Sequence, residues 1–519
     1  MTQHAVARLA QLAEHRPLRV QAGSEELILI RQGDQVHAYQ GNCPHAGAPL
    51  DEGVVCGGLL VCPWHKAAFA VDDGMVCEPP ALADLRRYKA WVKEGEVWVD
   101  DQPLPASEPP RHSDARCFVV VGAGAAGSAA VATLLAHGFA GRLVWVDQER
   151  QPAYDRTALS KFVIAGQMAP DEVPALLEAD ALRQGQLERK HGKVRTLNSQ
   201  KRQLTLADGQ QIDYDACLLA TGAKAQRPDI PGVDLPGVFT LRSREDAAQL
   251  LDAAEPGQPV VIVGDGFIGL EAASALRKYG VQVHVVTRHE VPLARQLGER
   301  IGRSIRELHE RKGVTFHGPT EVERIEGQDK VQAVRLANGE RLQTSLVLFG
   351  TGVKPATAFL QGVPLIEDKS VRVDAEMRAA DGLWAAGDIA TFPLTGHPAR
   401  IEHWRLAQQQ GVIAAANMLG EQRRYADVPF FWTYQHGRTY EVLGHARDWN
   451  RIEFVGEPEE GDFIAFQCVD ERVQAVIAKG YSDAMATLSQ RMKYPLTFDE
   501  SIKLVDTNLS DPLGDEVNC

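Results

Sequence analysis

The sequence contains two short segments, Cys43-Pro44-His45 and Cys62-Pro63-Trp64-His65, that restrict the fold of residues 1–100 strongly. Each segment pairs a thiol with an imidazole, as C-x-H and C-x-x-H, and sixteen residues separate His45 from Cys62. One kind of [2Fe–2S] cluster takes two thiolates on one iron and two imidazoles on the other. A Cys₂His₂ zinc site needs the same residue types, but its spacing usually begins with C-x₂₋₄-C and ends with H-x₃₋₅-H. The mixed pairs therefore predict an iron–sulfur cluster held by Cys43, His45, Cys62 and His65, with zinc as the alternative.

The residues around these ligands resemble the two cluster-binding loops of Rieske-type ferredoxins. A proline follows each cysteine, and Gly47 and Pro49 continue the first loop. High-potential members of that family join the loops by a disulfide, and the corresponding positions here are Ala48 and Trp64. The Ser and Tyr hydroxyls that donate to the cluster in those members are also missing. We therefore expect a potential near the low end of the range of roughly −150 to +300 mV. Lys66 stands where the resembling sequences usually have Gly.

The composition is that of an acidic globular protein. The chain has 519 residues, of which 44% are hydrophobic and 24% charged, and this length predicts three or four domains. The formal net charge of −14 argues against nucleic acid or an anionic membrane as a partner. No apolar run is long enough to predict a transmembrane helix, and the N-terminus lacks a hydrophobic signal core. The eight cysteines show no disulfide framework, so a reducing cytoplasm is the expected location.

Residues 1–100 are expected to form a small all-β domain. The segments 26–31 and 35–39 have the composition of strands on either side of a Gly-Asp turn, and residues 92–99 predict a closing hairpin. Residues 101–115 are polar and contain four prolines, which predicts a linker.

A dinucleotide-binding fingerprint follows the linker. An apolar strand at residues 117–121 leads into G-x-G-x-x-G, formed by Gly122, Gly124 and Gly127, and then into an Ala-rich segment typical of a helix. A second strand ends in Asp147. In such a βαβ unit the glycines admit a pyrophosphate to the helix N-terminus and the acid binds ribose hydroxyls.

The same fingerprint occurs again about 140 residues later. A strand at residues 259–263 leads into Gly264, Gly266 and Gly269, and a helix follows. Two such units in one chain imply two bound dinucleotides. We assign FAD to the first unit and a nicotinamide nucleotide, NADH or NADPH, to the second.

Two further segments support FAD in the first unit. Ala220-Thr221-Gly222 and Gly387-Asp388 resemble the A-T-G and G-D segments that complete FAD sites in two-dinucleotide flavoproteins. The FAD domain is therefore expected to be discontinuous, at residues 116–240 and 354–429, with the NAD(P) domain inserted at 241–353.

The second fingerprint departs from the NADH pattern at the end of its second strand. That strand ends in Thr287-Arg288 instead of an acid. Without a carboxylate the ribose 2′-hydroxyl loses its acceptor, and Arg288 could bind a 2′-phosphate. The alternative is a solvent-facing Arg at a strand end, so NADPH is favoured only slightly.

The region after the first unit distinguishes among flavoproteins. Disulfide reductases of this architecture carry a redox Cys pair there, whereas this chain has Tyr154-Asp155-Arg156-Thr157 and then Ala158-Leu159-Ser160-Lys161, without cysteine. The stretch resembles the flavin-flanking segment of ferredoxin reductases from aromatic-ring dioxygenase systems and of apoptosis-inducing factors. With residues 401–404, 429–432 and the Rieske-like loops, the chain resembles the apoptosis-inducing-factor-like subfamily over residues 5–505.

This resemblance implies roles for individual residues. Lys161 would lie near flavin N5 and pair with Glu271, and these two residues are the expected catalytic pair. Core packing for Trp432, a surface position for Lys161 and an ordinary first-turn acid for Glu271 remain alternatives. The residues expected to contact FAD are Gly122, Gly124, Gly127, Asp147, Arg156, Lys161, Thr221, Gly222, Gly387, Asp388, Glu402, His403 and Trp432. Those expected to contact NAD(P) are Gly264, Gly266, Gly269, Glu271, Thr287 and Arg288.

The resemblance also implies an architecture and a function. The expected fold is multidomain, with a small all-β Rieske domain, two α/β dinucleotide-binding (Rossmann-like) domains, an α/β C-terminal domain at 430–505 that aids homodimerisation, and a tail at 506–519. Electrons would pass from the nicotinamide through FAD to the cluster and on to a ferredoxin, a cytochrome or an oxygenase component. Two alternatives are a redox sensor, whose reduction controls dimerisation or partner binding, and a dedicated reductase of a separate oxygenase.

Overall fold

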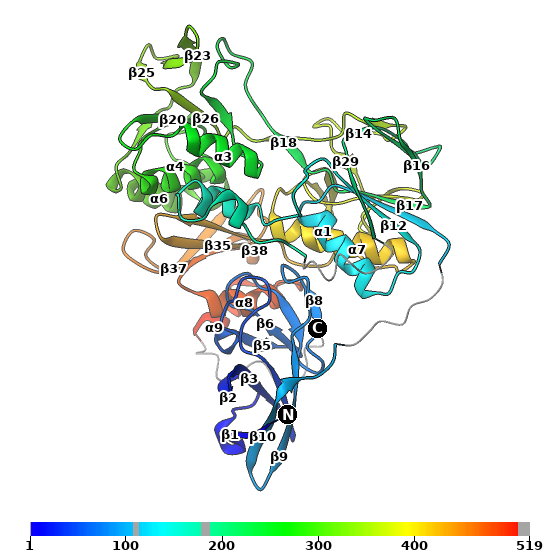
Figure 1. The fold of residues 1–519 in the computed structure, drawn as a ribbon. Helices are drawn as coiled ribbons and strands as arrows, with labels where there is room; N and C mark the ends of the chain where they lie inside the picture. The colour runs from blue at the N-terminus through cyan, green and yellow to red at the C-terminus, as the bar shows by residue number, and fades with distance from the viewer. Residues whose placement is uncertain (1, 107–113, 178–186, 507–519) are drawn as a thin grey trace.

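The structure is a computed structural model that describes residues 2–106, 114–177 and 187–506. Figure 1 shows four units, with the N-terminal unit at one end, the C-terminal unit against it, and the two fingerprint units beyond. Most of the predicted linker, residues 107–113, and most of the predicted tail, residues 507–519, lie outside the described residues.

The N-terminal unit consists of two antiparallel sheets. Six strands form one sheet in the order β1-β10-β9-β4-β3-β2, and four short strands form the other in the order β5-β6-β7-β8. The strands are β1 Gln3–Arg8, β2 Leu18–Ala22, β3 Glu25–Gln32, β4 Gln35–Gln40, β5 Val54–Cys56, β6 Leu59–Val61, β7 Ala68–Ala70, β8 Val76–Glu78, β9 Arg87–Lys93 and β10 Glu96–Pro103. The predicted strands and closing hairpin are thus present. Strand β10 continues to Pro103, which pairs with Tyr88 of β9, so the strand extends three residues into the segment expected as the linker.

The first fingerprint unit is built on a six-stranded sheet in the order β13-β12-β11-β17-β31-β30. Its strands are parallel except for the antiparallel pair β30–β31, and near-continuous apolar runs bury the inner strands β12, β11, β17 and β31. Helix α7 packs closely on α1, where Gly411 comes so near Ala126 that a Cβ would meet its carbonyl at 2.2 Å. The elements are β11 Cys117–Val121, α1 Ala125–Ala136, β12 Arg142–Asp147, β13 Leu187–His191, β17 Ala216–Leu219, β30 Arg378–Ala380, β31 Leu383–Ala385 and α7 Trp404–Leu419.

Smaller sheets flank this unit and join it to the next. Antiparallel β18 and β27 form the two-stranded connection between the fingerprint units (Figure 1). The flanking strands are β14 Val194–Asn198, β15 Gln203–Leu206, β16 Gln211–Asp213, β18 Ala223–Ala225, β27 Val353–Pro355, β28 Leu360–Gln361, β29 Val371–Arg372, β32 Ala390–Leu394 and β33 His397–Ala399.

The second fingerprint unit has a parallel five-stranded sheet in the order β19-β26-β20-β21-β22, and β23, β24 and β25 form an antiparallel sheet beside it. Its elements are β19 Val238–Thr240, α3 Arg244–Ala253, β20 Pro259–Val263, α4 Phe267–Tyr279, β21 Gln282–Val286, α5 Ala294–Leu297, α6 Glu299–Arg311, β22 Val314–His317, β23 Val322–Gly327, β24 Val331–Leu336, β25 Arg341–Gln343 and β26 Leu346–Phe349.

The C-terminal unit is an antiparallel sheet in the order β34-β35-β38-β37-β36, with two helices. Its elements are β34 Phe430–Gln435, β35 Arg438–Gly444, β36 Arg451–Gly456, β37 Phe463–Val469, β38 Arg472–Lys479, α8 Ser482–Arg491 and α9 Phe498–Asp506. Apolar side chains on one face pack against the second fingerprint unit, as Tyr440 and Phe463 do with Ile301. Helix α8 meets the small N-terminal sheet through Ala486, which packs on Val61 and Ala68.

None of the described helices combines the length and apolar character needed to cross a membrane.

Candidate functional site

The two predicted cluster loops have the same backbone design. In the first loop the Cys43 N–H donates to Ala48 O at 2.8 Å, and in the second the Cys62 N–H donates to Ala67 O at 2.8 Å. In both loops the fifth residue has positive φ, +76° for Gly47 and +60° for Lys66. Lys66 therefore adopts the conformation that Gly adopts in the sister loop.

The four predicted ligands converge as two like pairs. The Nδ1 atoms of His45 and His65 lie 3.1 Å apart, and the side chains of Cys43 and Cys62 are buried. A hydrogen bond between the two thiols lowers the pKa of Cys62 to about 7 and raises that of Cys43. Burial lowers the pKa of both imidazoles, so they are neutral, which is the form that binds iron.

The arrangement distinguishes a two-iron cluster from a zinc ion. Among the described residues, no three or more His, Cys, Asp or Glu side chains are placed to hold a single metal ion. A tetrahedral zinc site would bring four ligands to one point, whereas a [2Fe–2S] cluster divides them between two irons. The separate pairs fit the cluster. The backbone N–H groups of His45 and Ala46 on Cys43, and of Trp64 and His65 on Cys62, also suit thiolate sulfurs.

The cluster loops face the flavin-flanking segment and β34. The rings of His65 and Trp432 have centroids 4.1 Å apart at an interplanar angle of 42°. On the other side of the site, His45 Nε2 lies 3.9 Å from Asp155 Oδ2. Trp432 in turn lies under the Lys161 ammonium, whose Nζ is 5.6 Å from the indole centroid. Trp432 was expected beside FAD, and the structure brings a predicted cluster ligand to it as well.

Lys161 and Glu271 form a buried ion pair. Lys161 Nζ lies 3.1 Å from Glu271 Oε2, although the residues belong to different fingerprint units. Three more donors satisfy the carboxylate, namely the Ser160 hydroxyl at 2.6 Å, the Thr433 hydroxyl at 2.8 Å and the Tyr434 N–H at 3.2 Å. A buried charge is tolerable only with such partners. The expected pair is therefore joined by residues from β34 that the sequence did not indicate.

The first fingerprint has the close contacts that require glycine. A Cβ on Gly127 would lie 1.9 Å from Gly122 O, and one on Gly122 would lie 2.3 Å from Ala220 O. Gly124, by contrast, has open space around it and caps α1 without any side-chain hydrogen bond. The free N–H groups at the start of α1 therefore suit a pyrophosphate.

Several other predicted FAD residues stand at or just after the ends of strands in the same sheet. Asp147 is buried at the end of β12, and burial raises its pKa. Asp388 accepts a hydrogen bond from Arg242, and the Gly387 N–H donates to Gln410 at 2.7 Å. Two of the remaining charged residues form ion pairs, Arg156 with Glu149 and Glu402 with Arg400. The Thr221 hydroxyl donates to Ala356 O, and Gly222 beside it has φ +61°. The His403 ring packs on Phe431.

The second fingerprint repeats these features. A Cβ on Gly269 would meet Gly264 O at 2.3 Å, whereas Gly266 has open space and begins α4 without a side-chain cap. Thr287 is buried and accepts from the His289 N–H at 3.0 Å. Arg288 has a side chain that is 74% exposed and pairs with Glu321 at 3.0 Å. The structure thus keeps Thr287 and Arg288 at the strand end but gives Arg288 an acidic partner.

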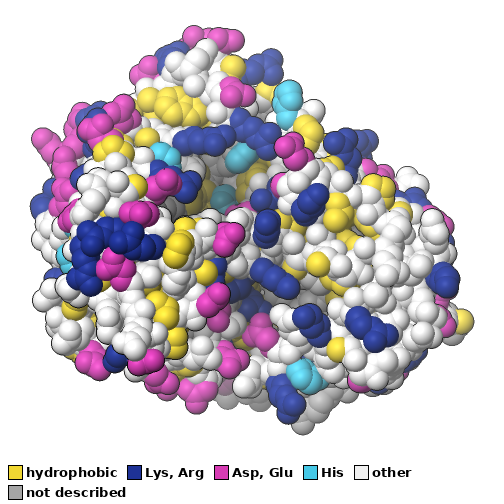
Figure 2. Space-filling view, turned by 90° about the horizontal axis from the view of Figure 1, so that it is seen from above, with side chains coloured by type: hydrophobic (Ala, Val, Ile, Leu, Met, Phe, Trp, Pro, Cys, Tyr) yellow, Lys and Arg dark blue, Asp and Glu magenta, His cyan; other side chains and the backbone are white. Residues whose placement is uncertain are grey.

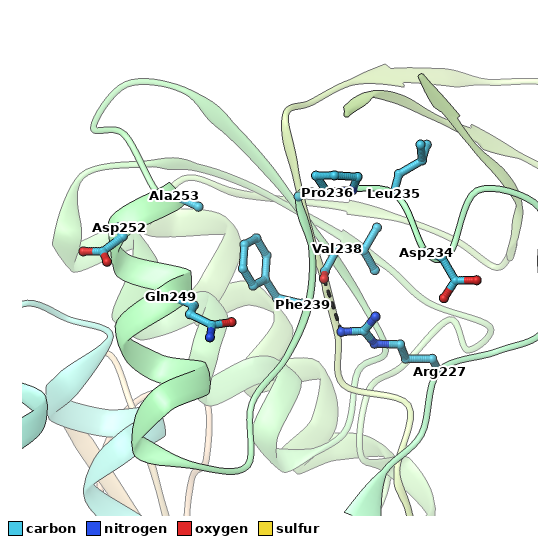
Figure 3. Close-up of a pocket in the computed structure, with 10 residues that line it drawn as sticks. Arg227, Asp234, Leu235, Pro236, Val238, Phe239, Gln249, Asp252 and Ala253 are labelled. Atoms are coloured by element: carbon cyan, nitrogen blue, oxygen red, sulfur yellow. Dashed lines mark hydrogen bonds between the residues drawn. The ribbon is translucent and has the colours of Figure 1, made fainter. Parts of the chain in front are cut away.

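Surface hollows lie around these units. A pocket of about 900 Å³ begins just beyond Asp147 and includes Arg150, Lys193 and Arg244. Figure 2 shows a central hollow with both basic and acidic side chains around it, and its Lys and Arg side chains place positive charge there in an acidic chain. Such charge suits phosphate groups. A smaller pocket of about 550 Å³, where Arg227 donates to Val238 O, contains no predicted site residue (Figure 3).

The sequence missed a set of charges between the N-terminal unit and the rest, all of them buried except the partly exposed Lys493. They are Lys66, Glu78, Arg405, Glu441 and Lys493, which pair across the contact. The one available signal was Lys66 at a position where Gly was expected. The others are separated by hundreds of residues and belong to no motif.

Comparisons with known proteins agree with these features. Residues 2–89 match the family described as Rieske [2Fe-2S] domain, and residues 117–411 match pyridine nucleotide-disulphide oxidoreductase. Apoptosis-inducing factor 3 of Mus musculus is 31% identical, over 93% of this chain and 83% of that protein. The biphenyl dioxygenase system ferredoxin–NAD(+) reductase component of Paraburkholderia xenovorans (strain LB400) is 34% identical, over 77% of this chain and 99% of that protein.

A solved structure supports the same fold. The covalent putidaredoxin reductase–putidaredoxin complex superimposes with a TM-score of 0.71 at 26% identity, over 76% of this chain and 97% of that chain. The predicted fold class, with its β domain followed by dinucleotide-binding α/β domains, is thereby confirmed. The individual site residues and the domain boundaries stay predictions.

Proposed function

Because the chain belongs to the pyridine nucleotide-disulphide oxidoreductase family and begins with a Rieske [2Fe-2S] domain, we propose that it carries electrons from a nicotinamide through FAD to its own cluster and then to an external acceptor. The chain is an NAD(P)H-dependent flavin oxidoreductase, with FAD and a [2Fe–2S] cluster as cofactors. FAD supplies the conversion between two-electron and one-electron chemistry, and the cluster takes single electrons. The protein residues set positions and charges.

The contact between His65 and Trp432 is the observation that carries the internal route. His65 is a predicted cluster ligand, and its ring lies 4.1 Å from the indole centroid. Trp432 also lies near the Lys161 ammonium, the residue expected at the flavin edge, with Nζ 5.6 Å from the indole centroid. On this proposal Trp432 would bridge the predicted cluster and flavin sites.

Lys161 and Glu271 are proposed to shape the nicotinamide side of the flavin. The ion pair is buried, and Ser160 and Thr433 hold the carboxylate in one orientation. A fixed ammonium beside the flavin edge would stabilise negative charge there and position the ring for hydride transfer. This role uses charge and geometry and needs no nucleophile.

The exposed side of the cluster loops is proposed as the place where electrons leave. Pro44 and Ala46 are exposed there, and the side chain of Trp64 is 46% exposed. The Trp64 ring contacts the His65 ring edge-on, with centroids 6.3 Å apart. A partner docking on this side would approach the cluster through a large apolar contact.

An anaerobic titration tests the proposal. NADH or NADPH is added to the complete protein while flavin absorbance and the electron paramagnetic resonance signal of the reduced cluster are recorded. The expected result is flavin bleaching followed by the reduced-cluster signal. Flavin reduction with a cluster that stays oxidised would contradict the internal route.

The relatives favour one second candidate, a reductase that serves a separate oxygenase. The bacterial relatives include reductase components of biphenyl and benzene dioxygenase systems. Mixing the reduced protein with a purified Rieske-type oxygenase component tests this candidate, because rapid oxidation of the reduced cluster is expected only if that component is an acceptor. Equal oxidation rates with and without the component would contradict it.

A further inference from the structure

Lys66 stands out among the buried residues of the N-terminal unit. Its side chain is fully buried, yet it carries an ammonium and follows the predicted ligand His65 directly. Its backbone has φ +60°, a left-handed conformation that is strained for an L-residue and that Gly47 adopts freely in the sister loop. The ammonium must therefore make interactions that offset both burial and conformation.

The partners of this ammonium come from two units. Within the cluster loop, Lys66 Nζ donates to Pro63 O. Across the contact it pairs with Glu441 of β35 at 2.7 Å and donates to Ser482 O at 3.3 Å. It also lies 5.5 Å from the centroid of the Phe430 ring. One side chain thus joins the loop that holds the second ligand pair to the C-terminal sheet and the start of α8.

A second network of charged side chains, centred on Glu78, lies next to Lys66. Glu78 of β8 pairs with Arg405 of α7 and with Lys493 after α8. Arg405 also donates to Lys66 O at 2.9 Å and to Pro79 O at 2.8 Å. The cluster loop is therefore held twice at Lys66. Glu441 of the C-terminal unit binds its side chain, and Arg405 of the first fingerprint unit binds its backbone carbonyl.

We propose that Lys66 is a positioning residue whose ion pair with Glu441 clamps the cluster loop against β34, with His65 on Trp432. Glu441 lies on β35, which pairs directly with β34 and so with Trp432, opposite Glu441 in the register. The clamp thus fixes the cluster loop relative to the strand that carries Trp432. This inference rests on the proposed function, since its consequence is a fixed electron route between the flavin and the cluster.

The Lys66–Glu441 pair is buried, so removing one partner and removing both should have different effects. Removing one partner leaves an unpaired charge in an apolar contact, which favours separation of the two units so that the charge can reach water. Replacing both partners by apolar side chains of similar length removes that penalty and restores packing. A clamp that acts by position therefore predicts that single variants fail and the double variant recovers.

The experiment uses the complete protein with its cofactors. The single variants are Lys66→Met, Lys66→Gly and Glu441→Gln, and the double variant is Lys66→Met with Glu441→Met. Lys66→Gly relaxes the backbone, so a loss in that variant does not come from loop strain. Glu26→Gln breaks the exposed pair with Arg19 in the same unit and is the matched control. Stopped-flow mixing with NADH measures flavin reduction and, by freeze-quench electron paramagnetic resonance, cluster reduction. Small-angle X-ray scattering measures the radius of gyration.

The expected result separates the two electron steps. In the single variants cluster reduction slows at least about tenfold while flavin reduction stays within about twofold, and the radius of gyration increases. The double variant and Glu26→Gln behave like the parent protein. Parent-like cluster reduction and scattering in the single variants would overturn the proposal, and so would a double variant as slow as the single ones. A parent protein whose cluster is never reduced would instead overturn the proposed function, and the scattering comparison would still test the clamp.

Discussion

The imidazole of His65 and the indole of Trp432 are in direct contact, with ring centroids 4.1 Å apart. His65 comes from a loop of the N-terminal unit and Trp432 from β34 of the C-terminal unit. The two residues join the predicted cluster to the predicted flavin site. We attribute their contact to the packing and the ion pairs that join the two units, so it is a property of the whole molecule.

Replacing Trp432 tests this contact directly. Trp432→Leu is expected to slow cluster reduction by about tenfold or more, because it opens a gap beside His65, whereas Trp432→Phe should retain an aromatic bridge and most of the rate. Freeze-quench electron paramagnetic resonance after mixing with NADH measures the rate. Flavin reduction recorded in the same mixing experiment is the control. Equal cluster-reduction rates in both variants and the parent would show that Trp432 is only a packing residue.

Substitutions of Gly124 and Gly266, the two fingerprint glycines with open space around them, should distinguish the FAD site from the nicotinamide site. A Cβ at Gly124 or at Gly266 meets no protein atom within 4 Å, so Ala at either position should change the unfolding free energy of the cofactor-free chain by less than about 0.5 kcal/mol. Each Cβ would instead occupy space needed by a phosphate. Gly124→Ala should therefore lower the FAD content of purified protein. Gly266→Ala should keep FAD but raise the KM for the nicotinamide.

The opposite pattern of losses would reverse the assignment of the two sites. Absorbance at the flavin band and initial-rate kinetics with a dye acceptor measure the two effects. Gly127→Ala is the comparison variant, because its Cβ would lie 1.9 Å from Gly122 O and should destabilise the fold itself.

A double-mutant cycle can measure how much the buried Lys161–Glu271 pair contributes to stability. Glu271→Leu leaves an unpaired ammonium and should lower the free energy of unfolding by about 3–5 kcal/mol. Adding Lys161→Met should restore much of that loss, as measured by urea unfolding at neutral pH. Hydride transfer should be slow in both variants, since neither has the ammonium–carboxylate pair that is predicted to lie at the flavin edge. A double variant with the parent rate of flavin reduction would exclude a catalytic role for the pair.

The choice between NADH and NADPH depends on Arg288 and its partner. Arg288 pairs with Glu321 at 3.0 Å, so a 2′-phosphate must compete with a carboxylate for the guanidinium. Glu321→Gln should therefore raise kcat/KM for NADPH and leave that for NADH unchanged. Arg288→Ala should lower kcat/KM for NADPH by about tenfold or more, since a hydrogen bond to a charged group contributes about 1.5–3 kcal/mol. Unchanged NADPH kinetics in Arg288→Ala would place Arg288 outside the nucleotide site.

A buried histidine pair predicts loss of stability in acid. His309 Nε2 lies 3.0 Å from the Gln435 amide oxygen, and burial lowers the pKa of His309 to about 3 and of its neighbour His436 to about 4. In the unfolded chain both side chains take up protons below about pH 6.5, whereas in the folded chain they do not until about pH 4 or 3. The unfolded state thus binds more protons in this window, so stability falls as the pH is lowered.

The slope of that fall can be assigned to His309 by substitution. Each such histidine contributes about 1.4 kcal/mol per pH unit well below its unfolded pKa. His309→Gln should remove one such contribution between about pH 6 and pH 4, measured by urea unfolding at several pH values. A slope that His309→Gln does not reduce would mean that other groups control the acid response.

Much of the site was predictable because its signals are local. The spacing of thiols and imidazoles predicts the ligand set of the cluster, and the structure brings His45 to His65 and Cys43 to Cys62. The glycine fingerprints follow from backbone approaches that leave no room for a Cβ, as at Gly127 and Gly269. Both signals are contained in a few neighbouring residues, so they can be recognised without knowing how the units pack.

The partners of those motifs could not be read in the same way. Glu271 is held by Thr433, which lies 162 residues away in sequence, and Lys66 pairs with Glu441 across 375 residues. Neither Thr433 nor Glu441 belongs to a periodic pattern or a motif that would identify it as a partner. The role of a buried Lys in a loop cannot be inferred until the residue that balances its charge is known. The sequence alone therefore predicts which cofactors the chain is built for. Only the tertiary structure sets the cluster loop against Trp432, because that placement depends on packing and ion pairing between units that are distant in the chain.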